Sequence, residues 1–195
     1  MTQFNGINHL ALVTGDMDAT IRYYRDLLGM RLVAGLGNKG YRHYFFSISE
    51  TDLIAFFEWP GVSKPEVKDH GVPVKGPAAF DHVAIGVQER QDLIDLKQRL
   101  SAAGFWVSEI IDHGFIHSIY SFDPNQIPIE FSWNVPGVDI RRTPQMKDPS
   151  PSTVTLEGPE PQHNRWPLPD DTPENQEEMD LTLYPGEGRI FFQES

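Results

Sequence analysis

The sequence predicts an α+β fold made of two paired βαβββ modules. A strand, a helix and three further strands follow one another twice within the first 133 residues. Residues 8–13 are similar to residues 81–87, and both are short apolar strands with a histidine near the start. The copies also end alike, at residues 56–59 and 129–133. Internal repetition of this kind identifies the supersecondary unit, and with it the fold class.

The first module is predicted at residues 5–60. Its first strand is followed by Asp16 or Asp18, either of which can cap a helix. Gly29 is the expected end of this helix, because glycine readily adopts the left-handed conformation found there. One helix face carries Ile21, Tyr24 and Leu28. Strand-like runs then follow at residues 31–36, 41–49 and 52–59.

The second module is predicted at residues 78–134 and repeats this order. A helix with a stripe of Leu93, Leu96 and Leu100 ends near Gly104. Strand-like runs are expected at residues 105–111, 117–122 and 127–133. Residues 1–134 therefore form the predicted domain, in which the two modules together enclose a cup.

The remaining residues, 135–195, have a different composition. Residues 134–195 hold 10 of the 16 prolines and 12 acidic against 5 basic residues. Proline-rich acidic stretches do not continue helices or central strands. We therefore expect a Pro-rich acidic C-terminal extension, with two apolar runs at 181–184 and 190–192 that can dock on the domain or on a partner subunit.

Composition excludes several classes of function. The chain has 195 residues, a net charge of −12 and no cysteine, so thiolate metal sites and cysteine nucleophiles are absent. An acidic protein is a poor binder of nucleic acid, whose counterions are displaced by clustered Lys and Arg. The longest apolar runs are far shorter than the roughly 20 residues of a membrane span. Since residues 1–13 lack the pattern of a signal peptide, we expect a cytoplasmic protein.

Two histidine–glutamate pairs carry the chemistry. His9 and Glu58 are separated by 49 positions, and His82 and Glu130 by 48, so the pairs are predicted at equivalent places in equivalent modules. A charge in an otherwise apolar strand is costly without a partner. If the four side chains converge, they suit a divalent metal such as Fe²⁺, Mn²⁺, Ni²⁺ or Zn²⁺. The alternative is that each His and Glu is an ordinary strand residue.

These residues resemble the vicinal oxygen chelate superfamily, which includes glyoxalase I, type I extradiol dioxygenases and fosfomycin and bleomycin resistance proteins. The resemblance covers about residues 5–134, with His9, Glu58, His82 and Glu130 at the ends of the modules. It implies a metal centre that chelates neighbouring oxygens of a small-molecule substrate. It also implies a homodimer, in which the metal is bound by one subunit or shared by two.

Residues 111–130 resemble the signature of extradiol dioxygenases, with His113, Tyr120, the Asp123–Pro124 turn and Glu130 in its places. The departure is Gln126, where the pattern has Gly or Pro. The resemblance implies that His113 hydrogen-bonds bound oxygen or substrate, and that Tyr120 steadies a catecholate oxygen. His117 is an alternative for the first role. A plain hairpin turn is the structural alternative for Asp123–Pro124.

Glu58 favours a second activity. In glyoxalase I, the corresponding end of the first module carries a carboxylate ligand, which can also move a proton between adjacent carbons. The resemblance favours an extradiol ring-cleaving dioxygenase that acts on a catechol-like aromatic and uses Fe(II), with His9, His82 and Glu130 as ligands and Glu58 as fourth ligand or base. The alternative is a lyase or isomerase of the glyoxalase I type that uses all four residues.

A third reading is a metal-free protein that binds aromatic drugs. The aromatic residues that could line its cup are Tyr41, Tyr44, Phe45, Phe46, Trp59, Phe105 and Trp106. Resistance proteins of this kind tend to lose the metal ligands. Since this chain keeps both His and both Glu, the enzyme readings are preferred.

Overall fold

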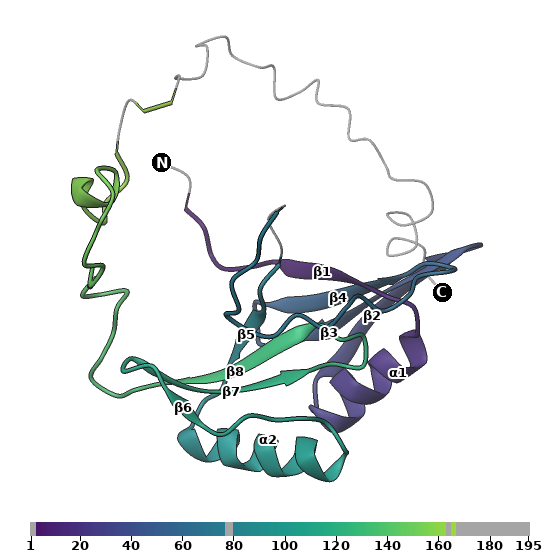
Figure 1. Ribbon diagram of the computed structural model, residues 1–195. Coiled ribbons are helices and arrows are strands. Elements are labelled where there is room, and N and C mark those ends of the chain that lie inside the picture. Colours follow the sequence, from purple (N-terminus) through teal and green to yellow (C-terminus); the bar gives the residue numbers. More distant parts are fainter. Residues whose placement is uncertain (1–2, 77–79, 163–164, 167–195) are drawn as a thin grey trace.

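The computed structural model describes residues 3–76, 80–162 and 165–166. Two four-stranded sheets carry the fold (Figure 1), with strand orders β1-β4-β3-β2 and β5-β8-β7-β6. In each sheet the first and last strands of the module run parallel and the other neighbours run antiparallel. The two sheets thus have the same topology, which confirms the predicted α+β fold of paired βαβββ modules.

The first module contains β1 (His9–Thr14), α1 (Met17–Ile21), β2 (Arg31–Asn38), β3 (Tyr41–Ser47) and β4 (Leu53–Glu58). Asp16 caps α1 by accepting a hydrogen bond from the Ala19 amide at 2.9 Å. A π-helical segment, Arg22–Leu27, continues α1. Gly29 ends it at a φ of +81°, a conformation that favours glycine.

The second module contains β5 (Val83–Gly86), α2 (Arg90–Ala102), β6 (Ile111–Asp112), β7 (Ile116–Phe122) and β8 (Pro128–Asn134). The strand predicted at 105–111 is wrong in extent, since regular strand structure is confined to β6. Before β6, an isolated antiparallel bridge between Val107 and Ser121 and two side-chain hydroxyls join the chain to β7. Ser108 Oγ accepts from the Tyr120 amide at 2.9 Å, and Ser121 Oγ donates to the Trp106 carbonyl at 2.8 Å.

Both helices lie below the sheets in Figure 1 and cover one face of them. The core lies between these layers and contains Met17, Tyr24, Phe46, Ile54, Phe56, Leu93, Leu100, Ile119, Ile129 and Phe131. Each of these side chains is at most 2% exposed. Side chains alternate between the two faces of a strand, so the neighbours of these core residues project from the opposite face. That opposite face, turned away from the helices, is called the open face below.

A buried polar cluster ties the modules together where the β7–β8 turn meets β1 and α1. Asn125 Oδ1 accepts from Thr14 Oγ1 at 2.6 Å, and its Nδ2 donates to Thr20 Oγ1 at 3.1 Å. Asp123 Oδ2 accepts from Tyr24 Oη at 3.2 Å and from Asn125 Nδ2 at 3.0 Å. The turn that resembled part of the dioxygenase signature therefore joins the two modules.

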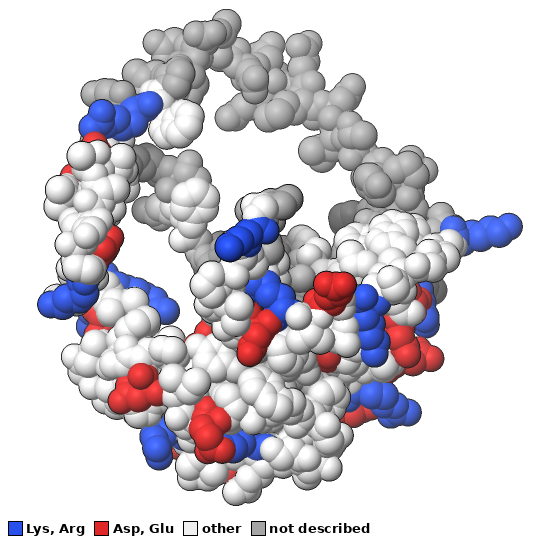
Figure 2. Space-filling view, in the orientation of Figure 1, with Lys and Arg blue, Asp and Glu red and all other residues white. Residues whose placement is uncertain are grey.

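Residues 135–162 and 165–166 run away from the sheets (Figure 1) and contain one short 3-10 turn, Thr155–Glu157. The domain boundary at 134 stays a prediction. The apolar runs at 181–184 and 190–192 lie outside the described residues. On the face shown in Figure 2, basic side chains alternate with acidic ones and form no continuous basic field.

Candidate functional site

His82 and Glu130 form the centre of the candidate site. His82 directly precedes β5, and Glu130 lies on β8, which pairs with β5 in parallel register. His82 Nε2 lies 2.8 Å from Glu130 Oε2. The neighbours Ile129 and Phe131 face the helices, so Glu130 projects from the open face. This pair, predicted from the sequence, is brought together by the structure.

Glu130 is a buried carboxylate, only 4% exposed. Its other oxygen, Oε1, accepts a hydrogen bond from Ser118 Oγ on β7 at 2.5 Å. A buried carboxylate is costly unless it is paired. Here its partners are one hydroxyl and one imidazole nitrogen.

His113 and Tyr120 lie beside this pair. Tyr120 faces Glu130 across the β7–β8 register, and its hydroxyl lies 2.8 Å from His113 Nε2. Burial raises the pKa of the Tyr120 phenol, and the nearby Glu130 charge raises it further. Tyr120 is therefore a neutral phenol at physiological pH and retains a hydrogen to donate.

A cavity of about 420 Å³ opens between these residues. It is lined by Asp69, His70, Gly71, His82, Trp106, Ser108, Ile111, His113 and Tyr120. Its walls combine the rings of His70, His82, His113 and Trp106 with the phenol of Tyr120. Apolar walls with a few polar groups are typical of cavities that bind small molecules.

His70 is a site residue that the sequence did not reveal. It lies in the segment between the modules, yet its side chain is 6% exposed and its ring packs against Tyr120 and Phe122, with centroids 4.8 and 5.0 Å away. Its Nε2 lies 3.2 Å from the Ile129 carbonyl, which identifies this nitrogen as the donor. No local pattern marks it, because the contact arises only when the connecting segment folds back over β8.

His117 lies on the other face of β7. It has the same parity as the core residue Ile119, so it projects toward the helices rather than toward Glu130. Its ring packs against Trp133 at 5.4 Å, and its Nε2 lies 3.5 Å from Asp112 Oδ1. The structure therefore favours His113 over His117 beside Tyr120.

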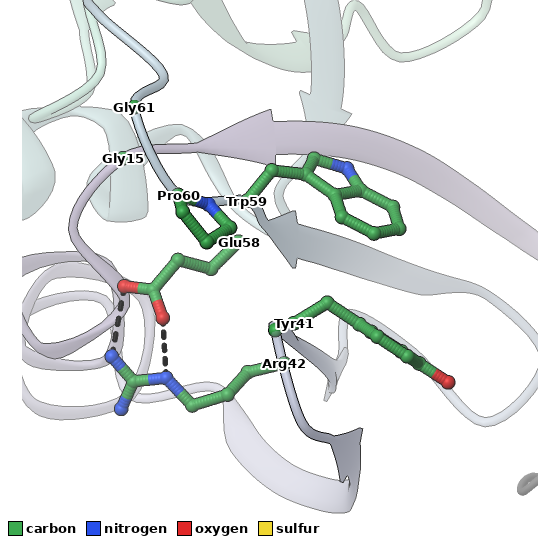
Figure 3. Close-up of a pocket in the computed structure, with 8 residues that line it drawn as sticks. Gly15, Tyr41, Arg42, Glu58, Trp59, Pro60 and Gly61 are labelled. Atoms are coloured by element: carbon green, nitrogen blue, oxygen red, sulfur yellow. Dashed lines mark hydrogen bonds and ion pairs between the residues drawn. The ribbon is translucent and has the colours of Figure 1, made fainter.

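Glu58 does not share the surroundings of Glu130. Its carboxylate forms a two-point ion pair with Arg42 (Figure 3), with Nη2 2.8 Å from Oε1. It also accepts a hydrogen bond from the Met17 amide at 2.8 Å. It has the parity of Ile54 and Phe56, which face the helices. Arg42 lowers the pKa of Glu58. Its placement does not support the expectation of a fourth ligand or base beside His82.

Spacing predicted that Glu58 and Glu130 occupy equivalent positions, and the strand register shows that this prediction is wrong. Glu130 lies opposite Ala84, two residues after His82, whereas the residue opposite Ala11, two residues after His9, is Ala55. Ala55 is therefore the counterpart of Glu130. The His–Glu separations of 49 and 48 positions are similar, but Glu58 lies three residues after Ala55 in β4. Because side chains alternate along a strand, this odd offset places Glu58 on the opposite face.

His9 is exposed at the start of β1, with Nδ1 2.8 Å from Asn8 Oδ1 and its ring 5.6 Å from that of Phe45. Among the described residues, no group of three or more His, Asp or Glu side chains is placed to hold a metal ion. One chain thus brings together two of the four predicted ligands.

The part of the chain that matches a known family has nearly the same bounds as the predicted repeat. Residues 6–131 match the family described as Glyoxalase/Bleomycin resistance protein/Dioxygenase superfamily. The chain belongs to this superfamily. It is 35% identical over 89 residues to the lactoylglutathione lyase of Haemophilus influenzae, which covers 43% of this chain and 58% of that protein. The match thus spans less than two thirds of the curated relative.

Solved structures of superfamily members share the fold. A glyoxylase/bleomycin resistance protein/dioxygenase domain from Frankia sp. EAN1pec has a TM-score of 0.58 at 20% identity, covering 68% of this chain and 100% of that chain. The lactoylglutathione lyase of Agrobacterium tumefaciens has a TM-score of 0.50 at 22% identity, covering 68% and 96%. Within the described part of this superfamily member, no helix is long and apolar enough to cross a membrane.

Proposed function

We propose that this protein is a divalent-metal-dependent enzyme of the vicinal oxygen chelate type, and specifically an extradiol ring-cleaving dioxygenase acting on a catechol-like aromatic. The observation that carries the choice is that one module, and not the other, has a carboxylate at the equivalent register position on the open face. Glu130 occupies that face in the second module, whereas Ala55 stands at its counterpart in the first. A set of His9, His82 and Glu130 is the two-histidine, one-carboxylate combination typical of non-haem Fe(II) oxygenases.

The residues present fit a metal ion. An imidazole nitrogen of His82, which lines the cavity, faces a carboxylate oxygen of the buried Glu130 at 2.8 Å. The other nitrogen of His82 contacts a carboxylate, Asp81 Oδ1, at 2.5 Å, an arrangement common for metal-binding histidines. When bound, Fe(II) would supply Lewis acidity and a place for oxygen.

Tyr120 and His113 are proposed to handle the substrate hydroxyls. The phenol of Tyr120 remains protonated, since its pKa is raised, and can donate to a catecholate oxygen. His113 Nε2, 2.8 Å away, can take up or return the hydrogen that the two side chains share. Both groups line the cavity with His82, so a substrate there would touch all three.

The rest of the cavity supports an aromatic substrate. Trp106 and Ile111 provide apolar walls, and Trp106 is 55% exposed without a ligand. The ring of His70 is held in place by packing against Tyr120 and Phe122. Stacking between flat rings and contact with an aliphatic side chain would orient a catechol with its oxygens toward His82 and Glu130.

The third ligand is proposed to come from a second copy of the chain. His9 projects from β1 together with Ala11 and Val13, all of them exposed. Among the described residues of one chain, no third His, Asp or Glu is placed to hold a metal ion together with His82 and Glu130. A homodimer that brings His9 of one subunit over His82 of the other would complete the set.

The alternative is a glyoxalase I-type lyase or isomerase on Ni²⁺, Zn²⁺ or Mn²⁺. It is favoured by the 35% identity to the lactoylglutathione lyase of Haemophilus influenzae. It requires a carboxylate that can leave the metal and move a proton. Glu58 would have to give up Arg42 and change faces to fill that role, which is why this activity ranks second.

The deciding experiment combines metal analysis of protein purified without chelator with oxygen uptake on a panel of catechols. We expect iron and substrate-dependent oxygen consumption. Turnover of a hemithioacetal without oxygen uptake would overturn the dioxygenase and establish the lyase. A His82→Ala, Glu130→Ala double variant that binds aromatic ligands as tightly as the native chain, with neither activity present, would instead establish a drug-binding protein.

A further inference from the structure

Asp69 places a carboxylate on the wall of the candidate cavity, beside His70 and Gly71. Its Oδ1 accepts a hydrogen bond from the His70 amide at 2.8 Å and lies 3.3 Å from His70 Nδ1. Both contacts use the same oxygen, and the side chain is 64% exposed. The segment between the modules therefore holds this carboxylate in place and leaves it accessible to a molecule in the cavity.

The cavity wall offers an anionic ligand no Lys or Arg among its described residues. Lys68 is the cation next to Asp69 along the chain, and its Nζ lies 2.6 Å from Asp81 Oδ2 and 3.1 Å from the backbone carbonyl of Asp69. The charge of Lys68 is therefore paired with Asp81. A wall with a carboxylate of this kind attracts a positively charged group and repels a negative one.

One imidazole ring separates Asp69 from the end of the cavity where Tyr120 is proposed to bind a substrate hydroxyl. His70 Nδ1 lies 3.3 Å from Asp69 Oδ1, and the centre of its ring lies 4.8 Å from that of Tyr120. The His70 side chain is buried, and its Nε2 lies 3.2 Å from the Ile129 carbonyl, so the ring is fixed in this place. A catechol whose hydroxyls lie beside Tyr120 can therefore bring a short side chain of its ring to Asp69.

We propose that Asp69 is a specificity-determining residue, which makes the cavity prefer catechols that carry a protonated amine on a short side chain. This inference rests on the proposed function, because it names the substrate class of the same site. An ammonium beside Asp69 exchanges part of its hydration for a charged hydrogen bond. A carboxylate in its place meets a like charge and loses water without a partner. Asp69 thus selects by attraction and by repulsion.

The test compares three catechols that differ in the charge on a two-carbon side chain. Dopamine carries an ammonium, 4-ethylcatechol carries no charge, and 3-(3,4-dihydroxyphenyl)propionate carries a carboxylate. Each is titrated calorimetrically into the full chain, purified without chelator, in oxygen-free buffer at about pH 8, where ordinary imidazoles are neutral and alkylamines are charged. The dissociation constants are measured without turnover, so they do not depend on dioxygenase activity.

In the native chain, dopamine should bind about threefold to fivefold more tightly than 4-ethylcatechol, the upper range for a partly exposed ion pair. The propionate should bind more weakly than 4-ethylcatechol by about the same factor. In Asp69→Asn the three dissociation constants should lie within about twofold of one another, since asparagine keeps the volume and still accepts from the His70 amide. The affinity for 4-ethylcatechol should not change, which separates loss of charge from a change in cavity shape. In Asp69→Lys the order should reverse.

Glu66→Gln is the matched control. Glu66 is an exposed carboxylate of the same segment and is not among the described residues that line the cavity. Its substitution changes the net charge of −12 by the same amount as Asp69→Asn does. The preference for dopamine should therefore persist in Glu66→Gln if it comes from Asp69 rather than from the overall charge of the chain.

The outcomes separate the two possible failures. An unchanged order in Asp69→Asn, an equal loss in Glu66→Gln, or a native chain that does not prefer dopamine overturns the role of Asp69. The proposed function fails by a different result, the absence of iron and of oxygen uptake. A preference for dopamine that Asp69→Asn abolishes, in a chain without oxygen uptake, supports the role of Asp69 and counts against the dioxygenase. Circular dichroism confirms that each variant is folded.

Discussion

The two modules have the same topology but different open faces. In the second module, the position two residues after the strand histidine faces Glu130, a buried carboxylate that contacts His82, and His82 lines a cavity. In the first module, the corresponding position faces Ala55, which is fully buried and has Phe45 directly across from it on β3. The comparison shows that a repeated backbone can keep a histidine–glutamate pair in one copy and cover the same place with packed side chains in the other.

The aromatic rings of β3 and β4 account for this closed face. His43 stacks on Phe57 with centroids 3.5 Å apart and contacts Phe45 at 4.3 Å. Phe57 stacks on Trp59 at 5.5 Å. Packed rings exclude water from the sheet beneath them. The face turned away from the helices is therefore covered by packed rings in the first module, whereas in the second module it carries polar side chains that contact one another.

The largest effect is expected from exchanging the two glutamates for glutamine. Glu130→Gln should weaken Zn²⁺ or Fe²⁺ binding by more than about 100-fold, because it removes the charge of the proposed ligand. This exceeds the loss of about 10- to 100-fold that is typical when a residue that only supports a ligand is removed. Glu58→Gln should leave metal affinity within about twofold, since Glu58 lies on the helix-covered face. Chelator competition measures both. An equal loss in the two variants would show that both carboxylates serve the metal, as the spacing of the sequence suggested.

Ala55→Glu tests whether packed side chains cover the open face of the first module. A carboxylate placed at this fully buried position would lack a partner, so we expect a loss of about 3 kcal/mol in the free energy of unfolding. Ala11→Glu is the matched control, because Ala11 lies opposite Ala55 on β1 but is exposed, and should change stability by less than about 0.5 kcal/mol. Urea denaturation measures both. A stable Ala55→Glu with increased metal affinity would mean that this face is open.

Asn125→Ala tests the cluster that joins the modules. Asn125 is 5% exposed and bonds to Thr14, Thr20 and Asp123. Its removal leaves buried polar groups without partners, and we expect a loss of about 2 kcal/mol. Gln91→Ala on the exposed side of α2 should cost less than about 0.5 kcal/mol. If Asn125→Ala unfolds at the native urea concentration, the cluster does not hold the modules together.

Much of the fold could be predicted from the sequence, because the repeat fixes topology and the glycines after each helix fix its end. His82 and Glu130 were found in the same way. Glu58 was misplaced because separation along the chain does not specify strand register, and a loop that differs by a few residues changes which residue faces the site. His70 was missed because it lies in the segment between the modules, where no periodic pattern links a side chain to a strand.

The pH dependence of stability should differ between Asp123 and an ordinary surface carboxylate. Burial raises the pKa of Asp123 despite its hydrogen bonds, so the folded state binds its proton more tightly than the unfolded state does. Its contribution to stability is complete below the unfolded pKa and is lost as pH rises through the raised folded pKa. Denaturation across pH 3–7 should therefore show a fall in stability that is absent from Asp123→Asn. A parallel pH dependence in both chains would contradict this.

The smallest effect is expected at the Arg42–Glu58 pair, and its pH dependence has the opposite sign. Arg42 lowers the pKa of Glu58, so the pair stabilises the fold above the ordinary glutamate pKa and loses this contribution as pH falls through the lowered value. The Arg42 side chain is 41% exposed, so solvent screens the pair and Arg42→Met should cost only about 1 kcal/mol. Thermal unfolding at low and high salt measures this cost, and the difference in stability between the native chain and Arg42→Met should shrink as the salt concentration rises. A cost that is unchanged by salt would point instead to packing of the Arg42 stem against the first module.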